Sequence, residues 1–167
     1  AGQGTRMKSS LPKVLHPIAG RPMIERVLEP ASAVSPDTTT LIVGHKAEAV
    51  RSTLVNTPNL LFALQEPQLG TAHALQQAEQ FLTGRTGALI LLSGDVPLLS
   101  PITLKQLLET HRGSGAAATV VTATVDRPYG YGRIVRTRGR VARIVEERDA
   151  SPTQRQIKEI NSGIYAF

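Results

Sequence analysis

The sequence contains neither cysteine nor tryptophan, and only 4% of its 167 residues are aromatic. Without cysteine it cannot build a disulfide scaffold, a zinc ribbon or a cysteine nucleophile. Its longest strongly apolar run, residues 88–92, is far shorter than the roughly 20 residues that a membrane helix needs. Residues 1–6 are polar and lack the pattern of a signal peptide. The length fits one globular domain with a core of its own.

Positive charge is in excess, with 19 Lys and Arg against 13 Asp and Glu and a formal net charge of +6. Such a balance favours a polyanionic partner, which is a nucleic acid, an acidic surface or a phosphorylated small molecule. The alternative is a basic surface that serves only solubility. The scarcity of aromatic side chains argues against stacking on single-stranded bases.

Helix and strand patterns alternate through the first two-thirds of the chain. Helices are expected at residues 23–28, 46–54, 72–82 and 102–111. Strands are expected at residues 39–44, 60–64, 88–92 and 116–125. The run at 88–92 is apolar throughout, which is typical of a central parallel strand covered on both faces. The alternation predicts an α/β fold with a mostly parallel central sheet and helices on both faces.

The last third of the chain is rich in strand patterns instead. Strands are expected at residues 132–136, 141–145 and 163–167. Arg138 and Gly139 separate the first two and predict a hairpin. We therefore expect one domain made of two lobes, residues 1–126 and a small antiparallel lobe at 127–167.

Three residues mark expected starts or ends of helices. Pro22 is suited to opening the helix at 23–28, and Pro30 should limit its length. Thr71 precedes apolar residues at helical spacing, which predicts that its side chain caps that helix.

The opening segment is rich in glycine and basic residues. Gly2 and Gly4 would let backbone amides approach a phosphate, and Arg6 and Lys13 would add two cations. The segment is not a Walker loop, because Met7 replaces a required glycine, and it lacks the third glycine of a dinucleotide-binding fingerprint. An ordinary turn remains the alternative.

Polar residues follow two of the expected strands. Asp95 ends the Ser93-Gly94-Asp95 segment, where a carboxylate could hold Mg²⁺ or act as a turn residue. Gln65 follows the strand at 60–64, and its amide could match the edge of a uracil or thymine. The alternative is a polar loop that leads to the helix cap.

Polar residues of the last third could grip sugar hydroxyls, or could simply be surface residues. They are Glu146 and Asn161, which flank strands, and Gly132 lies in a Gly-rich turn that leads into the first of these strands. The four histidines lack metal-ligand spacing and are interpreted as structural or exposed. Five arginines at 133, 136, 138, 140 and 143 form a basic hairpin, which is either a solvated face or an RNA contact.

Together these segments resemble the uridylyltransferase domain of the bacterial N-acetylglucosamine-1-phosphate uridylyltransferase family. The resemblance covers essentially the whole chain. Six blocks in the family's order carry it, at residues 1–7, 11–16, 68–74, 94–98, 130–134 and 154–161. It implies a Rossmann-like nucleotide-diphospho-sugar transferase fold. It also implies transfer of uridylyl from UTP to N-acetylglucosamine 1-phosphate, with pyrophosphate leaving.

The resemblance also assigns roles to residues. The nucleotide would be bound by residues of the first lobe, namely Gly2, Gly4, Lys13, Gln65, Gly70, Thr71, Ser93 and Gly94. The residues implied to be catalytic are Arg6, Lys13 and Asp95, with Asp95 as the Mg²⁺ ligand. The sugar would be held by Gly132, Glu146 and Asn161.

Parts of the family pattern lie outside this sequence. They are a strand before the Gly-rich loop, an asparagine that is the second metal ligand, and the β-helix responsible for acetyl transfer and trimer formation. We therefore expect a truncated domain without acetyltransferase activity, whose parent protein is a homotrimer. The family implies a cytoplasmic enzyme of cell-wall precursor synthesis, with small-molecule substrates and neither nucleic-acid nor membrane partners.

Two other functions remain open at this point. One is a sugar-1-phosphate nucleotidylyltransferase of another specificity, such as the thymidylyl type. The other is a non-catalytic basic module that binds nucleic acid.

Overall fold

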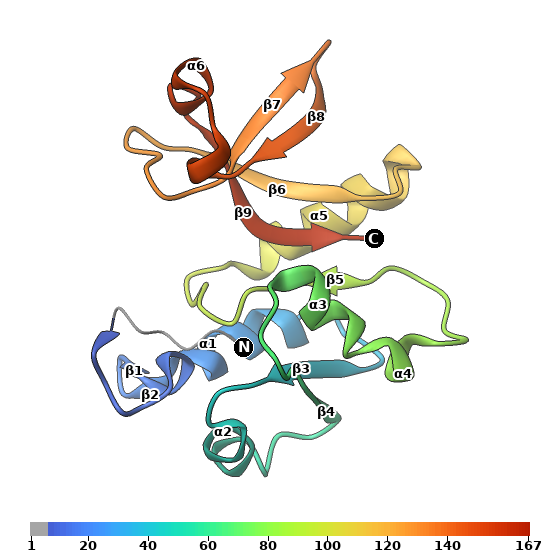
Figure 1. The fold of residues 1–167 in the computed structure, drawn as a ribbon. Helices are drawn as coiled ribbons and strands as arrows, with labels where there is room; N and C mark the ends of the chain where they lie inside the picture. Colours follow the sequence, from blue (N-terminus) through green and yellow to red (C-terminus); the bar gives the residue numbers. More distant parts are fainter. Residues whose placement is uncertain (1–6) are drawn as a thin grey trace. The chain divides into compact units, whose positions relative to one another are not determined.

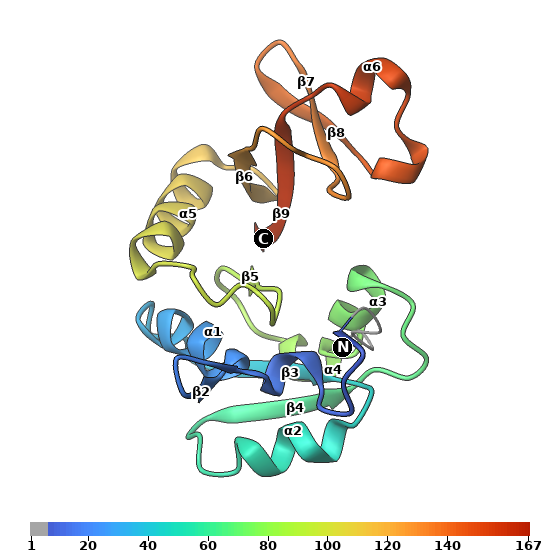
Figure 2. The same cartoon turned by 90° about the vertical axis from the view of Figure 1, so that its left-hand side faces the viewer.

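The computed structural model describes residues 7–167, which divide into two compact units (Figures 1 and 2). Among the described residues, the first unit comprises 7–87 and 94–105, and the second comprises 88–93 and 106–167. The helix α5 (Pro101–Ser114) begins in the first and ends in the second.

The first unit contains short elements around one parallel strand pair. In chain order they are η2 (Lys13–Leu15), β1 (Pro17–Ile18), β2 (Arg21–Pro22), α1 (Met23–Ser32), β3 (Thr39–Val43), α2 (Ala47–Thr53), β4 (Leu60–Leu64), α3 (Thr71–Gln76) and α4 (Glu79–Leu82). Strands β3 and β4 pair in parallel from Thr39 opposite Leu60 to Val43 opposite Leu64. The Gln65 amide extends the pairing by donating to the Val43 carbonyl at 2.7 Å. The residues that follow β3 and β4 therefore start from the same edge of the sheet.

An aliphatic cluster holds these elements together. Its buried members are Leu15 of η2, Ile24 of α1, Val43 of β3, and Val50 and Leu54 of α2 and its C-cap. Full burial of such a side chain contributes about 1.5–3 kcal/mol. The cluster fixes η2 against α1 and β3, and so fixes the position of Lys13.

The second unit is built on an antiparallel sheet with a long central strand. Its elements are β5 (Ile90–Leu91), β6 (Thr119–Thr124), β7 (Arg133–Thr137), β8 (Arg140–Val145), η3 (Glu147–Asp149), α6 (Pro152–Arg155) and β9 (Glu159–Ala166). Strand β9 pairs with β6 along its length, with β5 near its end and with β7 near its start. Strand β7 pairs in turn with β8 (Figure 1).

The expected hairpin at 138–139 is confirmed. Thr137 pairs with Arg140 across a two-residue turn in which Arg138 has φ 50° and Gly139 has φ 78°. Positive φ at both central residues is the type I′ geometry, which matches the right-handed twist of the strands it joins.

The α/β class and Rossmann-like fold are confirmed, but the expectation of a mostly parallel sheet was wrong. Within residues 7–167 only β3 and β4 pair in parallel, and the run at 88–92 is not a parallel strand. Only Ile90 and Leu91 form a strand, and it pairs antiparallel with the end of β9. The expected strand at 163–167 is also longer, since β9 begins at Glu159 and contains Asn161. The run is also not covered on both faces, since Ala88 is exposed and residues 89–92 are only partly buried. Apolar residues alone do not report the direction of the neighbouring strand.

Three expectations about helices were wrong. Thr71 does not cap α3, because Gly70 occupies the N-cap position and no side chain caps it. The helix expected at 72–82 is divided into α3 and α4. Pro30 lies inside α1, which continues to Ser32. Pro30 cannot donate to the carbonyl four residues earlier, that of Arg26, and α1 ends two residues after it.

Candidate functional site

Lys13 and Asp95 meet although they lie 82 residues apart in the sequence. The Lys13 Nζ lies 2.5 Å from the Asp95 Oδ2, and the two side chains remain 39% and 40% exposed. Exposed ion pairs contribute at most about 1 kcal/mol, because water screens them. A ligand that binds either group more strongly can therefore open the pair.

Gly94, which precedes Asp95, lies within van der Waals distance of η2 and α1. A Cβ atom at residue 94 would lie 3.4 Å from the Val14 Cγ1 and 3.5 Å from the Ile24 Cδ1, so the segment before Asp95 rests on η2 and α1. The turn of η2 is closed by the Leu15 amide, which donates to the Pro12 carbonyl at 2.9 Å. The backbone thus presents the Lys13 ammonium and the Asp95 carboxylate on neighbouring segments.

Gln65 is only 3% exposed, and its side chain hydrogen-bonds to the loop that precedes α3. Its Nε2 donates to the Gly70 carbonyl at 2.9 Å and lies 3.2 Å from the His73 Nδ1. Gly70 has φ 98° and ψ −175°, a conformation open almost only to glycine. Thr71 is the first residue of α3 and is exposed. The structure therefore brings Gln65, Gly70 and Thr71 together after β4.

The carboxylate of Asp95 fits one protein ligand of a Mg²⁺ ion. Within residues 7–167, no group of three or more His, Asp or Glu side chains is gathered closely enough to hold a metal ion. Mg²⁺ is commonly bound by one or two carboxylates together with substrate phosphates and water. A lone exposed carboxylate beside a lysine suits a metal that arrives with a phosphate.

The three residues with an expected role at the sugar converge in the second unit. A Cβ atom at Gly132 would lie 3.1 Å from the Glu146 Oε1. The Gly132 carbonyl accepts from the Asn161 amide at 2.9 Å. The Asn161 Oδ1 accepts from the Gly163 amide at 3.0 Å and from the Tyr165 hydroxyl at 2.9 Å. Glu146 is exposed, so its carboxylate is available to a ligand.

Ser93 lies against Gly163, a contact that the sequence analysis missed. A Cβ atom at residue 163 would stand 3.0 Å from the Ser93 Oγ, and Gly163 has φ 77°. The positive φ favours glycine there, and a Cβ would also require the Ser93 hydroxyl to shift by a few tenths of an ångström. The signal available in the sequence was a glycine inside a strand pattern, which often marks close approach of another group.

The basic hairpin is not a uniform solvated face. Arg133 is 1% exposed, and its Nη2 lies 2.6 Å from the Glu147 Oε2. Arg136 makes two contacts with Glu159, at 2.8 and 2.6 Å. Each guanidinium lowers the pKa of its glutamate partner by hydrogen bonding. Arg136, Arg138, Arg140 and Arg143 are all exposed, and Arg133 is the buried member.

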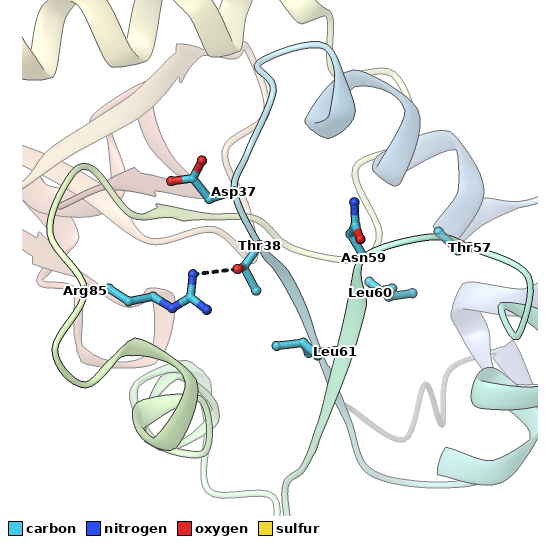
Figure 3. A pocket seen from close by; sticks show the side chains of 7 residues that line it. All are labelled: Asp37, Thr38, Thr57, Asn59, Leu60, Leu61 and Arg85. Carbon is cyan, nitrogen blue, oxygen red and sulfur yellow. Dashed lines mark hydrogen bonds between the residues drawn. The ribbon is translucent and has the colours of Figure 1, made fainter.

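A shallow cavity of about 310 Å³ lies at the other end of the parallel strand pair (Figure 3). Asp37 and Thr38 precede β3, Asn59 precedes β4, and Arg85 donates to the Thr38 Oγ1 at 2.7 Å. It contains none of the expected site residues. Gly2, Gly4 and Arg6 lie outside the described residues.

A chain with this α/β fold, a lysine–carboxylate pair and an amide-held loop after a parallel strand has the features of a nucleotide-binding domain. Residues 1–159 match the MobA-like NTP transferase domain, and the chain belongs to this family of nucleotidyltransferases.

Relatives with curated names are similar over the whole chain. The chain is 54% identical over 168 residues to the bifunctional protein GlmU of Pelobacter propionicus, and covers 36% of it. It is 48% identical over 168 residues to the bifunctional protein GlmU of Enterococcus faecalis, again covering 36%. The chain thus spans a little over a third of the length of these relatives.

Solved structures share the fold at lower identity. A crystal structure of apo UDP-glucose pyrophosphorylase superposes with a TM-score of 0.77 at 18% identity, covering 100% of this chain and 73% of that one. HddC from Yersinia pseudotuberculosis superposes with a TM-score of 0.75 at 21% identity, covering 95% and 68%. These likenesses concern the fold.

Proposed function

We propose that this chain carries the uridylyl-transfer site of a bifunctional protein and joins UTP to N-acetylglucosamine 1-phosphate. The products are UDP-N-acetylglucosamine, a precursor of the cell wall, and pyrophosphate. The observation that carries the proposal is the meeting of Lys13 and Asp95. Identity of about half to the GlmU proteins over the whole chain supports it.

In this proposal an oxygen of the sugar phosphate attacks the α-phosphorus of UTP. A new P–O bond forms there, and the bond from the α-phosphorus to the bridging oxygen breaks as pyrophosphate leaves. The attacking oxygen is already ionised, so no side chain needs to remove a proton. Catalysis then consists of positioning and of neutralising negative charge.

Different residues would bind the triphosphate, the metal ion and the sugar. Lys13, together with Arg6, would neutralise the triphosphate, while Gln65 holds the Gly70 loop against which the uracil would lie. Asp95 would hold Mg²⁺, which when bound supplies further positive charge at the phosphates. Gly132, Glu146 and Asn161 would bind the sugar. The division into a nucleotide lobe at 1–126 and a sugar lobe at 127–167 belongs to this proposal.

The same proposal places the protein in the cytoplasm, where nucleoside triphosphates are available, and gives the parent protein a homotrimeric state through another domain. No helix within the described part of the chain has the length and apolar character to cross a bilayer.

The test is pyrophosphate release by the chain with each combination of UTP or dTTP and N-acetylglucosamine 1-phosphate or glucose 1-phosphate. We expect the highest rate with UTP and N-acetylglucosamine 1-phosphate, and saturable binding of Mg²⁺ with UTP in calorimetry. A preference for dTTP would replace this proposal by the thymidylyl type. RNA binding that weakens steeply with salt, without saturable UTP binding, would replace it by a nucleic-acid module.

A further inference from the structure

Arg133 is the most deeply buried charged side chain of the second unit among the described residues, with 1% of it exposed. Its Nη2 contacts the Glu147 Oε2 at 2.6 Å and the Arg155 carbonyl at 3.5 Å, and its Nη1 donates to the Tyr131 carbonyl. A buried guanidinium is stable only when it is paired and hydrogen-bonded. The role of Arg133 is therefore inferred from the groups that it contacts.

Glu147 contacts the same turn. Its Oε2 accepts from the Gly130 amide at 3.1 Å as well as from Arg133, and its Oε1 lies 3.8 Å from the Arg155 Nε. The ion pair thus holds one carbonyl and one amide of consecutive residues, Tyr131 and Gly130.

These two residues belong to a tight turn that leads to the expected sugar site. The Tyr131 amide donates to the Pro128 carbonyl at 3.2 Å, and Gly130 has φ 85°, as a type II turn requires at this position. Gly132 follows the turn directly and precedes Arg133. Glu146 directly precedes Glu147. Each member of the ion pair is therefore the chain neighbour of a residue with an expected role at the sugar.

We propose that the Arg133–Glu147 ion pair positions the sugar side of the active site, by holding the 128–131 turn so that Gly132 and Glu146 face the same ligand. The ligand named here, a sugar 1-phosphate, rests on the proposed function. Arg133 and Glu147 are positioning residues, because they act through the turn and its neighbours. A displacement of about 1 Å at such a site can cost about 100-fold in rate.

A merely structural ion pair would stabilise the unit without affecting sugar binding, and the chain contains a matched control. Arg136 also lies on β7, three residues after Arg133, and binds Glu159 through two hydrogen bonds. It donates to the Gly139 carbonyl at 2.8 Å, so it holds the opposite end of the hairpin. Loss of the Arg136–Glu159 pair should lower stability and leave the 128–131 turn in place.

The experiment compares Glu147→Gln and Arg133→Lys with Glu159→Gln and Arg136→Lys in the whole chain. The first readout is the state of the turn, followed by hydrogen exchange and chemical shifts of the Gly130, Tyr131 and Gly132 amides. The second is binding of the substrates, followed by the KM for N-acetylglucosamine 1-phosphate and the KM for UTP. Glutamine keeps the size and shape of glutamate, and lysine keeps the charge of arginine without its two-pronged geometry. These variants therefore test the contacts with little change in volume.

We expect Glu147→Gln to speed exchange at Gly130 and to raise the KM for the sugar phosphate about 10-fold or more, with the KM for UTP within about twofold. Arg133→Lys should show a smaller change of the same kind. The control variants should lower the melting temperature while leaving both readouts unchanged.

The proposal is overturned if the Gly130 amide and the sugar KM of Glu147→Gln match those of the parent chain, or if the control variants change them equally. Absence of activity in the chain without substitutions would count against the proposed function instead. The exchange and shifts at residues 130–132 would then still decide whether the ion pair sets the turn, since they need no ligand.

Discussion

At the scale of single residues, the Lys13–Asp95 pair links the two groups that the proposed reaction needs at the phosphates. In the structure the two groups pair with each other at 2.5 Å. A triphosphate would attract the lysine, and its metal would attract the carboxylate. Nucleotide and metal should therefore bind with positive coupling, since each removes the competitor of the other.

The first prediction concerns Lys13→Gln. Removal of the ammonium should lower the affinity for UTP in the presence of Mg²⁺ by about 10-fold, the scale of one charge-assisted hydrogen bond. It should raise the affinity for Mn²⁺ or Mg²⁺ in the absence of nucleotide, because Asp95 is freed. Calorimetry with and without UTP measures both, with Lys105→Gln on the exposed face of α5 as control. A fall in nucleotide-free metal affinity would contradict the coupling.

The second prediction concerns Gly70→Ala. Space is not limiting, since no atom lies within 4 Å of an added Cβ, but φ is 98°. The strain should destabilise the loop by about 1–3 kcal/mol and displace the carbonyl that Gln65 holds. Thermal unfolding measures the loss. Gly113→Ala in α5, where space is also open and φ is not positive, should be neutral or stabilising. Equal melting temperatures for the two variants would refute the argument from φ.

At the scale of elements, the β7–β8 hairpin depends on its turn. Arg138 adopts φ 50°, which a long side chain tolerates poorly, beside Gly139 at φ 78°. Type I′ turns favour asparagine followed by glycine, because asparagine adopts positive φ more readily. We therefore expect the turn to be less stable with arginine at residue 138 than with asparagine.

The third prediction follows for Arg138→Asn. The hairpin should become more stable by up to about 1 kcal/mol, with slower hydrogen exchange at the amides that pair β7 with β8. Gly139→Val should have the opposite effect, because a β-branched residue at positive φ is strained. Faster exchange in Arg138→Asn would show that the arginine side chain contributes more than its backbone costs.

At the scale of the whole molecule, a net charge of +6 suits anionic substrates. Two glutamates, Glu147 and Glu159, form ion pairs with arginines within the second unit. Hydrogen bonds from Arg133 and Arg136 lower the pKa of Glu147 and of Glu159 respectively below the ordinary 4.5. A carboxyl with a lowered folded-state pKa stabilises the fold above its unfolded pKa. That stability is lost as the pH falls from the unfolded pKa through the lower folded one.

The fourth prediction is therefore a loss of stability below about pH 4.5. The urea midpoint of the chain should fall between pH 5 and pH 3. In the double variant Glu147→Gln, Glu159→Gln the midpoint should be lower at pH 7 and change less over that interval, because the two titrating groups are gone. Parallel profiles for parent and variant would show that other carboxylates control acid unfolding.

The sequence alone indicated the α/β class, the hairpin turn at 138–139 and the blocks that resemble the uridylyltransferases, because turn chemistry and hydrophobic periodicity are local. It also indicated Lys13 and Asp95 individually, through residue type and the strand before Asp95. It did not indicate the N-cap at Gly70, where Gln65 from outside the helix holds the Gly70 carbonyl. It also did not indicate the break between α3 and α4.

Only the tertiary structure decided which residues meet. The 2.5 Å contact between Lys13 and Asp95, the burial of Arg133 against Glu147 and the antiparallel pairing of residues 90–91 with β9 all join segments distant in the chain. Local patterns report which side chains avoid water and where the backbone turns. They do not report a partner, because the free energy of a long-range contact depends on how the segments between are packed.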